Sequence, residues 1–287
     1  MVMLATRFAP SPTGRLHLGH AYAALVAHDA ARARGGAFRL RIDDIDSGRC
    51  RGEFRAAIDA DLAWLGLLPD GPPLVQSTRA PRYDAALERL RQEGLLYPCF
   101  CSRSDIAAAA TAPHGPEGLV YPGTCRALEA DQRAERMAAG MVPAWRLDLA
   151  AATARTGQLD WVEAGAGPVV ARPDLLGDVV LGPRDRIAAY HLASTIDDAD
   201  MAITLVTRGR DLAFATHMHR LLQALLDLPT PDYRHHALIG GAARVRLAKR
   251  DGAAELAALR DAGVDPAALV ASLRAGQLPL GYCWVDA

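Results

Sequence analysis

Two histidines three residues apart, His17 and His20, begin a predicted helix directly after a corner that contains proline and glycine. They lie in the segment RFAPSPTGRLHLGHAYAAL, which starts at Arg7. The start of a helix offers backbone N–H groups and a positive dipole end, and both attract anions. Because residues three apart share one helix face, both imidazoles could donate to phosphate oxygens. Gly19 between them would let a phosphate or a flat ring approach the backbone. The alternative is an amphipathic helix that happens to begin with two histidines.

The segment RVRLAKRDG is a second candidate for binding phosphate, because it holds the single lysine of the chain. Of the 32 basic residues, 31 are arginine and one, Lys249, is lysine. Lysine supplies a compact point charge on a flexible stem, which the planar guanidinium of arginine does not replace. With Arg244, Arg246 and Arg250 beside it, such a loop could close over a triphosphate and offset charge on leaving pyrophosphate. A solvated basic loop, with a lysine kept by chance, is the alternative.

Three of the five cysteines form a candidate metal site. Cys99, Cys101 and Cys125 lie within one short segment. An odd number of cysteines in a chain that we expect in the cytoplasm argues against a disulfide framework. Three thiolates fit a closed tetrahedral zinc site, and imidazole chemistry favours His114 as the fourth ligand. Three unliganded cysteines are the alternative.

An alternation of strands and helices must position these groups. Hydrophobic spacing predicts strands at 2–8 and 38–42 and helices at 18–34, 52–65 and 83–93. From 99 to about 185 the pattern loosens into short strands and turns. It resumes with a helix at 190–198, a strand at 202–208, a helix at 211–226 and a strand at 233–239. One or two short helices are expected after Lys249.

This pattern predicts an α/β fold with a Rossmann-like doubly wound parallel sheet that an insertion divides. We expect residues 1–98 and 186–250 to form the two halves of a nucleotide-binding domain, 99–185 to form the insertion, and 251–287 to form a helical C-terminal segment. Ligands of such sheets bind beyond the carboxyl ends of the strands. Arg7–Ser11, Asp43, Asp44 and Arg208 should therefore meet at one crevice.

Composition limits the class of protein but does not identify its function. The chain has 287 residues, 51% apolar and 23% charged, with a net charge of −1. These values are ordinary for a soluble globular protein, and no apolar run reaches the length of a membrane span. We therefore expect a cytoplasmic protein with no membrane partner. The balanced charge excludes a globally basic nucleic-acid binder, although a local patch would still suffice for RNA.

The two phosphate-site candidates together resemble the signatures of class I aminoacyl-tRNA synthetases specific for glutamate. RFAPSPTGRLHLGH resembles the first signature, with HLGH in place of histidine-isoleucine-glycine-histidine. RLAKR resembles the second, lysine-methionine-serine-lysine-serine, with Arg246, Ala248 and Arg250 as departures. The lysine that this family uses on ATP falls on Lys249.

The resemblance implies roles for further residues. RIDDID, from Arg41, resembles the family's turn that binds the α-ammonium of the amino acid, and that role falls on Asp43, which is shorter than the family's glutamate. YHLASTIDDADMAITLVTRGRDL resembles the segment that supplies a tyrosine and an arginine to the substrate, here Tyr190 and Arg208. Residues implied in glutamate binding are Arg7, Ala9, Ser11, Asp43, Tyr190 and Arg208. Those implied on ATP are His17, Gly19, His20 and Lys249, of which His17, His20 and Lys249 would be catalytic.

We expect no anticodon-reading domain after Lys249, and the predicted insertion carries Cys-x-Cys and Tyr-x-x-x-Cys. In both respects it resembles the glutamyl-queuosine tRNA(Asp) synthetases, truncated paralogues of glutamyl-tRNA synthetase. This resemblance implies Tyr121 as the fourth ligand of one structural Zn²⁺ held by Cys99, Cys101 and Cys125. It also implies activation of L-glutamate by ATP, with its Mg²⁺, to glutamyl-adenylate without tRNA, then transfer to queuosine in the anticodon arm of tRNA(Asp) by a monomer.

Two other functions stay open from the residues alone. A minimal glutamyl-tRNA synthetase would charge a tRNA 3′ end, and a synthetase relic would bind RNA without catalysis. Formation of an adenylate, and its dependence on tRNA, would separate the three.

Overall fold

Three parallel strands from the first part of the chain form one side of a central sheet. The computed structural model describes residues 3–109, 114–115, 118–241 and 255–285. In it β1 (Ala5–Phe8) pairs with β2 (Ala37–Ile42), and β2 pairs with β3 (Leu74–Val75). Helix α1 (Leu18–Arg32) joins β1 to β2, and α2 (Gly52–Trp64) joins β2 to β3. A Cβ atom on Gly36 would lie 2.2 Å from the carbonyl oxygen of Leu4, so glycine lets β2 start beside β1.

The other side of the sheet comes from the second part of the chain. β11 (Leu205–Gly209) and β12 (Asp232–His236) are parallel, and α7 (Tyr190–Asp200), the short 3₁₀ helix η3 (Arg210–Leu212) and α8 (Ala215–Leu225) flank them. β11 lies against β1, where Thr204 N donates to the Ala5 carbonyl at 3.0 Å and Ala5 N donates to Thr204 Oγ1 at 2.9 Å. These two hydrogen bonds join the sheet β1-β2-β3 edge to edge with the sheet that contains β11 and β12. The strands then follow one another in the order β3-β2-β1-β11-β12, which is that of a doubly wound sheet. The predicted α/β class is confirmed.

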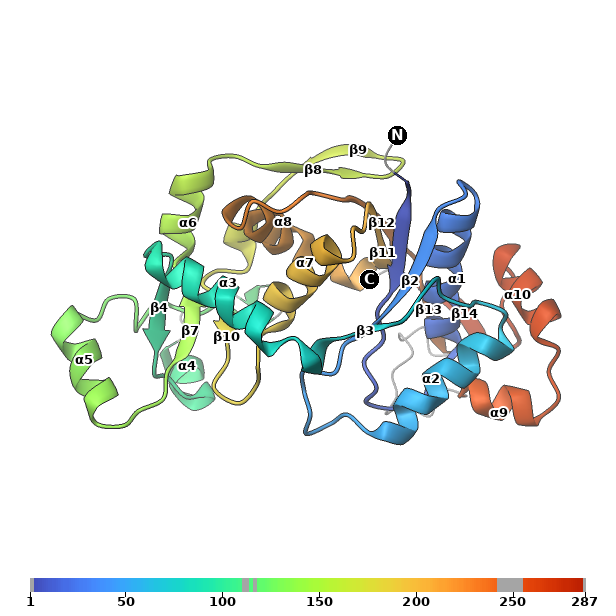
Figure 1. Ribbon diagram of the computed structural model, residues 1–287, viewed down its shortest axis with the longest axis horizontal. Coiled ribbons are helices and arrows are strands. Elements are labelled where there is room, and N and C mark those ends of the chain that lie inside the picture. The colour runs from blue at the N-terminus through green and yellow to red at the C-terminus, as the bar shows by residue number, and fades with distance from the viewer. Residues whose placement is uncertain (1–2, 110–113, 116–117, 242–254, 286–287) are drawn as a thin grey trace.

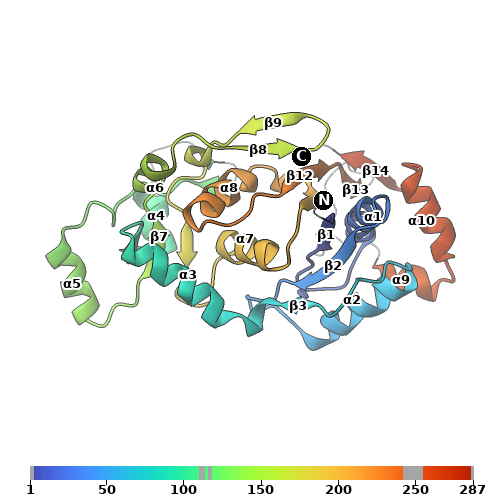
Figure 2. The ribbon, with the colours of Figure 1, turned by 45° about the horizontal axis from the view of Figure 1, so that its top comes forward.

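The predicted insertion contributes to two sheets. β4 (Leu96–Cys99), β7 (Ala144–Leu147) and β10 (Val180–Gly182) form a small antiparallel sheet. By contrast, β8 (Asp160–Glu163) pairs in parallel with β12, and β9 (Gly167–Val170) pairs with β8, so both strands extend the central sheet. Figure 2 shows β8 and β9 along its outer edge, next to β12. The predicted division at residues 98, 185 and 250 stays a prediction.

The remaining elements lie between β3 and β10 in the chain. They are η1 (Gln76–Thr78), α3 (Ala80–Gln92), α4 (Arg103–Ala109), β5 (His114–Gly115), β6 (Gly118–Leu119), α5 (Ala130–Ala138), α6 (Leu149–Thr156) and η2 (Pro173–Leu175). Figure 1 shows α4 and α5 at the end of the molecule opposite α9 and α10.

The predicted C-terminal helices are present as α9 (Leu256–Asp261) and α10 (Pro266–Arg274), but the segment also ends in an unexpected strand. β14 (Tyr282–Val285) pairs antiparallel with β13 (Leu238–Gly241). The strand predicted at 233–239 is divided at Ala237 into β12 and β13, which belong to different sheets. Pairing across more than forty positions is not visible in local hydrophobic spacing.

Small residues let α1 pack closely on the sheet. Ala21, Ala24, Ala27 and Ala31 are buried along one face of this helix and share a core with Phe38, Leu40 and Ile42 of β2. Polar functional residues at the N-terminal end of α1 are thereby fixed to a rigid layer. Within the ranges described above, no helix combines the length and the apolar character needed to span a membrane.

Candidate active site

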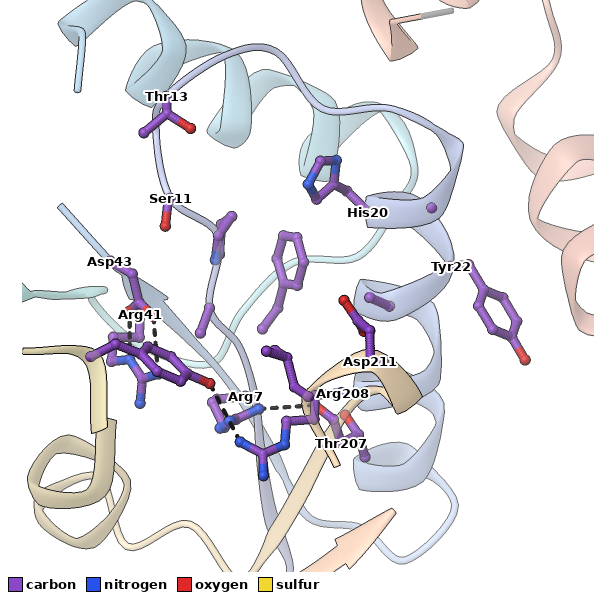
Figure 3. Close-up of a pocket in the computed structure, with 18 of the residues that line it drawn as sticks. Arg7, Ser11, Thr13, His20, Tyr22, Arg41, Asp43, Thr207, Arg208 and Asp211 are labelled. Carbon is purple, nitrogen blue, oxygen red and sulfur yellow. Dashed lines mark hydrogen bonds and ion pairs between the residues drawn. The ribbon is translucent and has the colours of Figure 1, made fainter. Parts of the chain in front are cut away.

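A cavity of about 500 Å³ lies beyond the carboxyl ends of β1, β2 and β11. Nine residues singled out from the sequence line it: Arg7, Ala9, Ser11, His17, Gly19, His20, Asp43, Tyr190 and Arg208. Figure 3 shows the guanidinium groups of Arg7 and Arg208 close together at one end, whereas Thr13 and His20 lie at the other. Lys249 and the rest of its segment lie outside the described residues. The structure thus brings the two ends of the candidate site together around one cavity, while the roles of its residues stay proposals.

The two histidines of the corner cap helix α1. His17 is the N-cap, and its Nδ1 accepts from Gly19 N at 3.1 Å; Nδ1 of His20 accepts from His17 N at 3.1 Å. The two rings lie with their centroids 3.8 Å apart. Because Nδ1 accepts in both rings, the ring proton of each neutral imidazole is on Nε2. The histidines therefore replace the usual serine or aspartate cap with groups that also carry an N–H donor on their far side.

Gly19 is constrained by this cap. A Cβ atom there would lie 3.0 Å from Cε1 and 3.2 Å from Nδ1 of the His17 ring. Such contacts are closer than carbon atoms normally approach, so a side chain would displace the imidazole. The sequence suggested that glycine leaves space for a ligand, and the structure adds that it leaves space for His17.

Buried ionic bonds fix the arginines of the strand ends. Asp198, on α7, accepts from Arg7 Nε at 2.8 Å and from Arg41 Nη1 at 2.6 Å. Arg41 also holds both carboxylate oxygens of Asp43, at 2.6 and 3.2 Å. Arg7 Nη1 donates to the Thr207 carbonyl at 2.9 Å, which connects β1 to β11. Asp198 therefore sets the orientation of two guanidinium groups that come from neighbouring strands.

The pKa values of the two carboxyl groups move in opposite directions. Burial raises the pKa of Asp43, and the Arg41 guanidinium opposes this rise without cancelling it. Burial would also raise the pKa of Asp198, but Arg7 and Arg41 together hold it below its usual value. Asp198 is thus the more firmly ionised member of this group.

Arg208 differs from the other two arginines because its partners are neutral. Its Nε donates to His235 Nε2 at 3.2 Å, its Nη2 donates to Thr216 Oγ1, and its Nη1 lies 3.4 Å from both Tyr190 OH and His219 Nδ1. Burial and the charge of Arg208 lower the pKa of His219, which keeps that imidazole neutral. In the part of the chain that the structure describes, no carboxylate forms an ion pair with Arg208, although the residue is buried.

The charges around this end of the cavity balance when Glu163, behind His235, is counted. Arg7, Arg41 and Arg208 supply three positive charges, Asp43 and Asp198 supply two negative ones, and the Glu163 carboxylate, 2.7 Å from His235 Nδ1, supplies the third. Asp197 is neutralised separately, because it accepts from Arg79, Gln76 and Tyr83. Asp43 and Asp198 contact Arg7 and Arg41, whereas Arg208 contacts neutral groups among the described residues. Arg208 is therefore the guanidinium at this end that is best placed to bind a carboxylate of a ligand.

The structure describes the residues on both sides of the segment that contains Lys249. These flanking residues lie next to the corner that holds His17 and His20. Leu238 and Ile239 of β13 line the cavity, and the chain returns at Glu255, which forms a bridge to His17. Leu256 N also donates to the Leu16 carbonyl at 2.9 Å. Both ends of the segment that contains Lys249 are thus anchored beside the histidine corner.

Some residues of the cavity were not assigned a role from the sequence. Arg41 lay in a quoted motif, but nothing marked it as the partner of Asp198. Thr207 and His236 line the cavity, and Thr207 Oγ1 and His236 Nε2 are buried with no hydrogen-bond partner among the described residues. Thr207 follows the alternation of a buried strand, so its hydroxyl could have been noticed as a polar group on a buried face.

The three cysteines predicted to bind metal converge with Tyr121. Their sulfur atoms lie within 4.8 Å of one another. Cys101 Sγ is 3.4 Å from Cys125 Sγ, and Tyr121 OH is 3.5 Å from the sulfur atoms of both Cys99 and Cys101. A tetrahedron with Zn–S bonds of about 2.3 Å and a Zn–O bond of about 2.0 Å has edges of roughly 3.5–3.8 Å. The four groups therefore fit one tetrahedral zinc ion, whereas the side chain of His114 lies outside the described residues.

Cations and polar groups hold this cluster in place. Arg146 lies over the Tyr121 ring at 3.9 Å and donates to Cys99 Sγ at 3.3 Å, and Arg184 donates to the Cys99 carbonyl at 2.8 Å. Burial would raise the pKa of Cys125, but hydrogen bonds from the Tyr121 hydroxyl and from Phe100 N lower it to about 7. By contrast, burial raises the pKa of the Cys101 thiol to about 11. These surroundings therefore favour the thiolate that a metal requires at Cys125, and not at Cys101.

The chain is similar to known proteins over most of its length. Residues 3–279 match the family described as class I tRNA synthetases (E and Q), catalytic domain. The chain is 49% identical over 274 residues to the glutamyl-Q tRNA(Asp) synthetase of Rhodobacter capsulatus, covering 92% of this chain and 97% of that protein. It is 44% identical over 281 residues to the protein of the same name from Symbiobacterium thermophilum, covering 94% and 85%. A crystal structure of a glutamate tRNA ligase from Elizabethkingia meningosepticum in complex with its amino acid superposes with a TM-score of 0.72 at 28% identity. That match covers 88% of this chain and 53% of the ligase, so the chain spans about half of the solved protein.

Proposed function

Because the chain belongs to the family of class I tRNA synthetases for glutamate and glutamine, which are ligases, we propose that it activates L-glutamate with ATP and transfers it to queuosine in tRNA(Asp). The names of the two relatives support tRNA(Asp) and its modified base as the acceptor. The residues that line the cavity support glutamate as the amino acid. One observation carries the proposal: Arg208 is a buried guanidinium whose described partners are all neutral.

Glutamate fits the charges at this end of the cavity. At neutral pH it carries two carboxylates and one ammonium, which are complementary to the guanidinium groups of Arg208 and Arg7 and to the carboxylate of Asp43. Arg208 binds the side-chain carboxylate through its planar fork, with Tyr190 beside it. Arg7 faces the α-carboxylate, and Asp43 accepts from the α-ammonium. Ala9 and Ser11 form the wall between them.

ATP occupies the other end, beside the histidine corner. His17 and His20 donate from Nε2 to phosphate oxygens, because their Nδ1 atoms are engaged in the cap. Gly19 keeps this arrangement free of a side chain. Lys249 acts as a point charge on the pyrophosphate as it leaves. ATP brings Mg²⁺ with it, and no residue of this chain is assigned to that ion.

The reaction then needs positioning and neutralisation of charge, with no covalent protein intermediate. An oxygen of the glutamate α-carboxylate attacks the α-phosphorus of ATP, the bond to the β-phosphate oxygen breaks, and pyrophosphate leaves. The products of this step are glutamyl-adenylate and pyrophosphate. A hydroxyl of queuosine next attacks the acyl carbon and loses its proton, and AMP leaves. The rigid bonds of Asp198 to Arg7 and Arg41 keep the substrate carboxylate aligned during both steps.

We assign one structural zinc ion to Cys99, Cys101, Cys125 and Tyr121. The fit is supported by the distances between the four groups and by the cations around them. Four protein ligands leave no open position, so the ion would hold the inserted segment together and take no part in the reaction.

Exchange of labelled pyrophosphate into ATP tests the proposal, with every amino acid tried in turn and with or without total tRNA. Exchange with glutamate alone, in the absence of tRNA, is the expected result. Glutamate should then be transferred to tRNA(Asp) that contains queuosine and not to the same tRNA without it. Exchange that requires tRNA, with an ester at the 3′ end, would indicate a minimal glutamyl-tRNA synthetase. No exchange at all would indicate an RNA-binding relic.

A further inference from the structure

A carboxylate of the inserted segment reaches the arginine end of the cavity through a histidine. Glu163, the last residue of β8, pairs with Tyr233 of β12. Its Oε1 accepts from the backbone N–H of His235 at 2.8 Å, and its Oε2 lies 2.7 Å from His235 Nδ1. Both oxygens of one carboxylate are therefore committed to one histidine.

This contact determines which ring nitrogen of His235 carries the proton. A carboxylate accepts, so Nδ1 is the donor and Nε2 keeps its lone pair. Burial and the charge of Arg208 lower the pKa of His235 to about 4, so the imidazole is neutral at physiological pH. The neutral ring with its proton on Nδ1 can then accept at Nε2 from Arg208 Nε, 3.2 Å away.

Thr216 completes a closed set of hydrogen bonds. Arg208 Nη2 donates to Thr216 Oγ1, which lies 3.3 Å from His235 Nε2 and can donate to it. Nε and Nη2 form one edge of a guanidinium, so His235 and Thr216 together occupy that edge. On the second edge, formed by Nη1 and Nη2, Nη1 makes only two long contacts of 3.4 Å, to Tyr190 OH and His219 Nδ1. A carboxylate could replace these long contacts with two parallel hydrogen bonds to that edge.

We propose that Glu163 and His235 are positioning residues for the amino-acid substrate: Glu163 fixes the tautomer of His235, and His235 fixes the plane of Arg208. The inserted segment thereby takes part in glutamate recognition through β8. This inference rests on the proposed function, because it requires Arg208 to bind the glutamate side chain.

Pairing of the strands does not need this carboxylate. β8 is attached to β12 by a backbone bond from Ala164 N to the Tyr233 carbonyl, 2.6 Å long. A residue that served the sheet alone could be apolar at position 163. The contact of Glu163 with the His235 ring therefore explains the carboxylate better than strand pairing does. The His235 side chain has only 7% of its surface exposed.

The substitution Glu163→Gln tests the proposal in the full-length protein. Glutamine offers one oxygen in place of two, and the backbone N–H of His235 cannot change its polarity, so the oxygen should face that group. The amide nitrogen would then face Nδ1, and the ring proton would move to Nε2, opposite the Arg208 Nε–H. We expect the KM for glutamate in pyrophosphate exchange to rise about tenfold or more, since a hydrogen bond to a charged group is lost. The KM for ATP should change less than about twofold.

Two further variants serve as controls. Asp160→Asn removes the same charge from an exposed position of β8, and both KM values should stay unchanged. His235→Gln should raise the KM for glutamate by itself, and adding Glu163→Gln to it should have little further effect, because the two residues act in series.

The ring tautomer gives a measurement that does not depend on activity. Nitrogen-15 NMR of the nine histidines should show His235 protonated on Nδ1 in the wild type and converted in Glu163→Gln. His236 and His28, whose Nδ1 atoms face the Ala237 carbonyl and the Asp29 carboxylate, should keep their signals in both proteins. Unchanged glutamate KM in a folded Glu163→Gln protein, or equal increases in both KM values, would overturn the positioning role alone. A wild-type protein without glutamate-dependent exchange would instead overturn the proposed function and this inference with it.

Discussion

Asp198→Asn should destabilise the protein more than any exposed substitution on the same helix. The wild-type carboxylate is almost fully buried and binds Arg7 at 2.8 Å and Arg41 at 2.6 Å. Asparagine keeps one acceptor oxygen, but it removes the charge and turns an amide N–H₂ toward a guanidinium. Arg7 would then lose its only carboxylate partner among the described residues, and Arg41 would lose one of its two. Breaking a buried ion pair on one side costs about 3–5 kcal/mol. With an unfolding entropy of about 2.1 cal/mol/K per residue over 287 residues, the melting temperature should fall by about 5–8 °C.

Thermal unfolding followed by circular dichroism measures this difference, and Asp200→Asn is the matched control. Asp200 lies two residues further along α7 and pairs with Arg79 and Arg82 where water has access. Exposed ion pairs contribute less than about 1 kcal/mol, so the control should melt within a few degrees of wild type.

The contribution of Asp198 to the free energy of unfolding should depend on pH in a defined direction. Arg7 and Arg41 hold the pKa of Asp198 below its usual value, despite its burial. A lowered pKa in the folded state means that the unfolded state takes up the proton first as the pH falls. The stabilisation is therefore complete above about pH 4, and it is lost as the pH drops through the lower folded value. Asp198→Asn should lack this acid-side loss. Equal melting temperatures for Asp198→Asn and Asp200→Asn at pH 7 would refute the reasoning.

Four other outcomes follow from the structure. Arg208→Lys should raise the KM for glutamate about 30- to 100-fold in pyrophosphate exchange and leave the KM for ATP within about threefold, because lysine lacks the paired donors; an unchanged glutamate KM would contradict this role. Gly19→Ala places a Cβ 3.0 Å from the His17 ring and should lower the maximal exchange rate about tenfold, with a loss of about 1 kcal/mol in unfolding experiments. Cys125→Ser should abolish the stoichiometric zinc found by atomic absorption, whereas Cys283→Ser should retain it. Urea unfolding should show stability falling between pH 6.5 and about 4, by up to roughly 3 kcal/mol from His235, because its folded pKa lies below its usual value and the unfolded ring is protonated first; a flat profile over this range would contradict the assignment.

Local patterns in the sequence were sufficient to predict which polar residues stand at the ends of strands and helices around the cavity. The corner from Arg7 to His20 was visible because proline, glycine and histidine are unusual together at the start of a helix. The cysteines were visible through their spacing. Since parallel strands end at the same edge of a sheet, the strand order predicted that Asp43 and Arg208 would meet.

Contacts that depend on side-chain direction were not predictable in this way. Nothing in the segment that contains Asp198 distinguishes it from Asp197, although one binds Arg7 and Arg41 and the other binds Arg79 and Gln76. Adjacent residues of a helix point in different directions. The orientation of α7 relative to the sheet therefore decides which of the two aspartates faces Arg7 and Arg41. Glu163 and β14 were missed for a related reason, because each pairs with a strand that is distant in sequence.

The junction between β1 and β11 has a consequence for synthesis of the chain. Ala5 and Thr204, which make its hydrogen bonds, are 199 residues apart in sequence. At about 5–20 residues per second, a ribosome needs on the order of 10–40 s to add that length. During that time the edge of β1 has no native neighbour on one side, and the strand that closes it has not yet been made. The nascent chain therefore has to keep an apolar strand edge from pairing elsewhere until most of the protein has been translated.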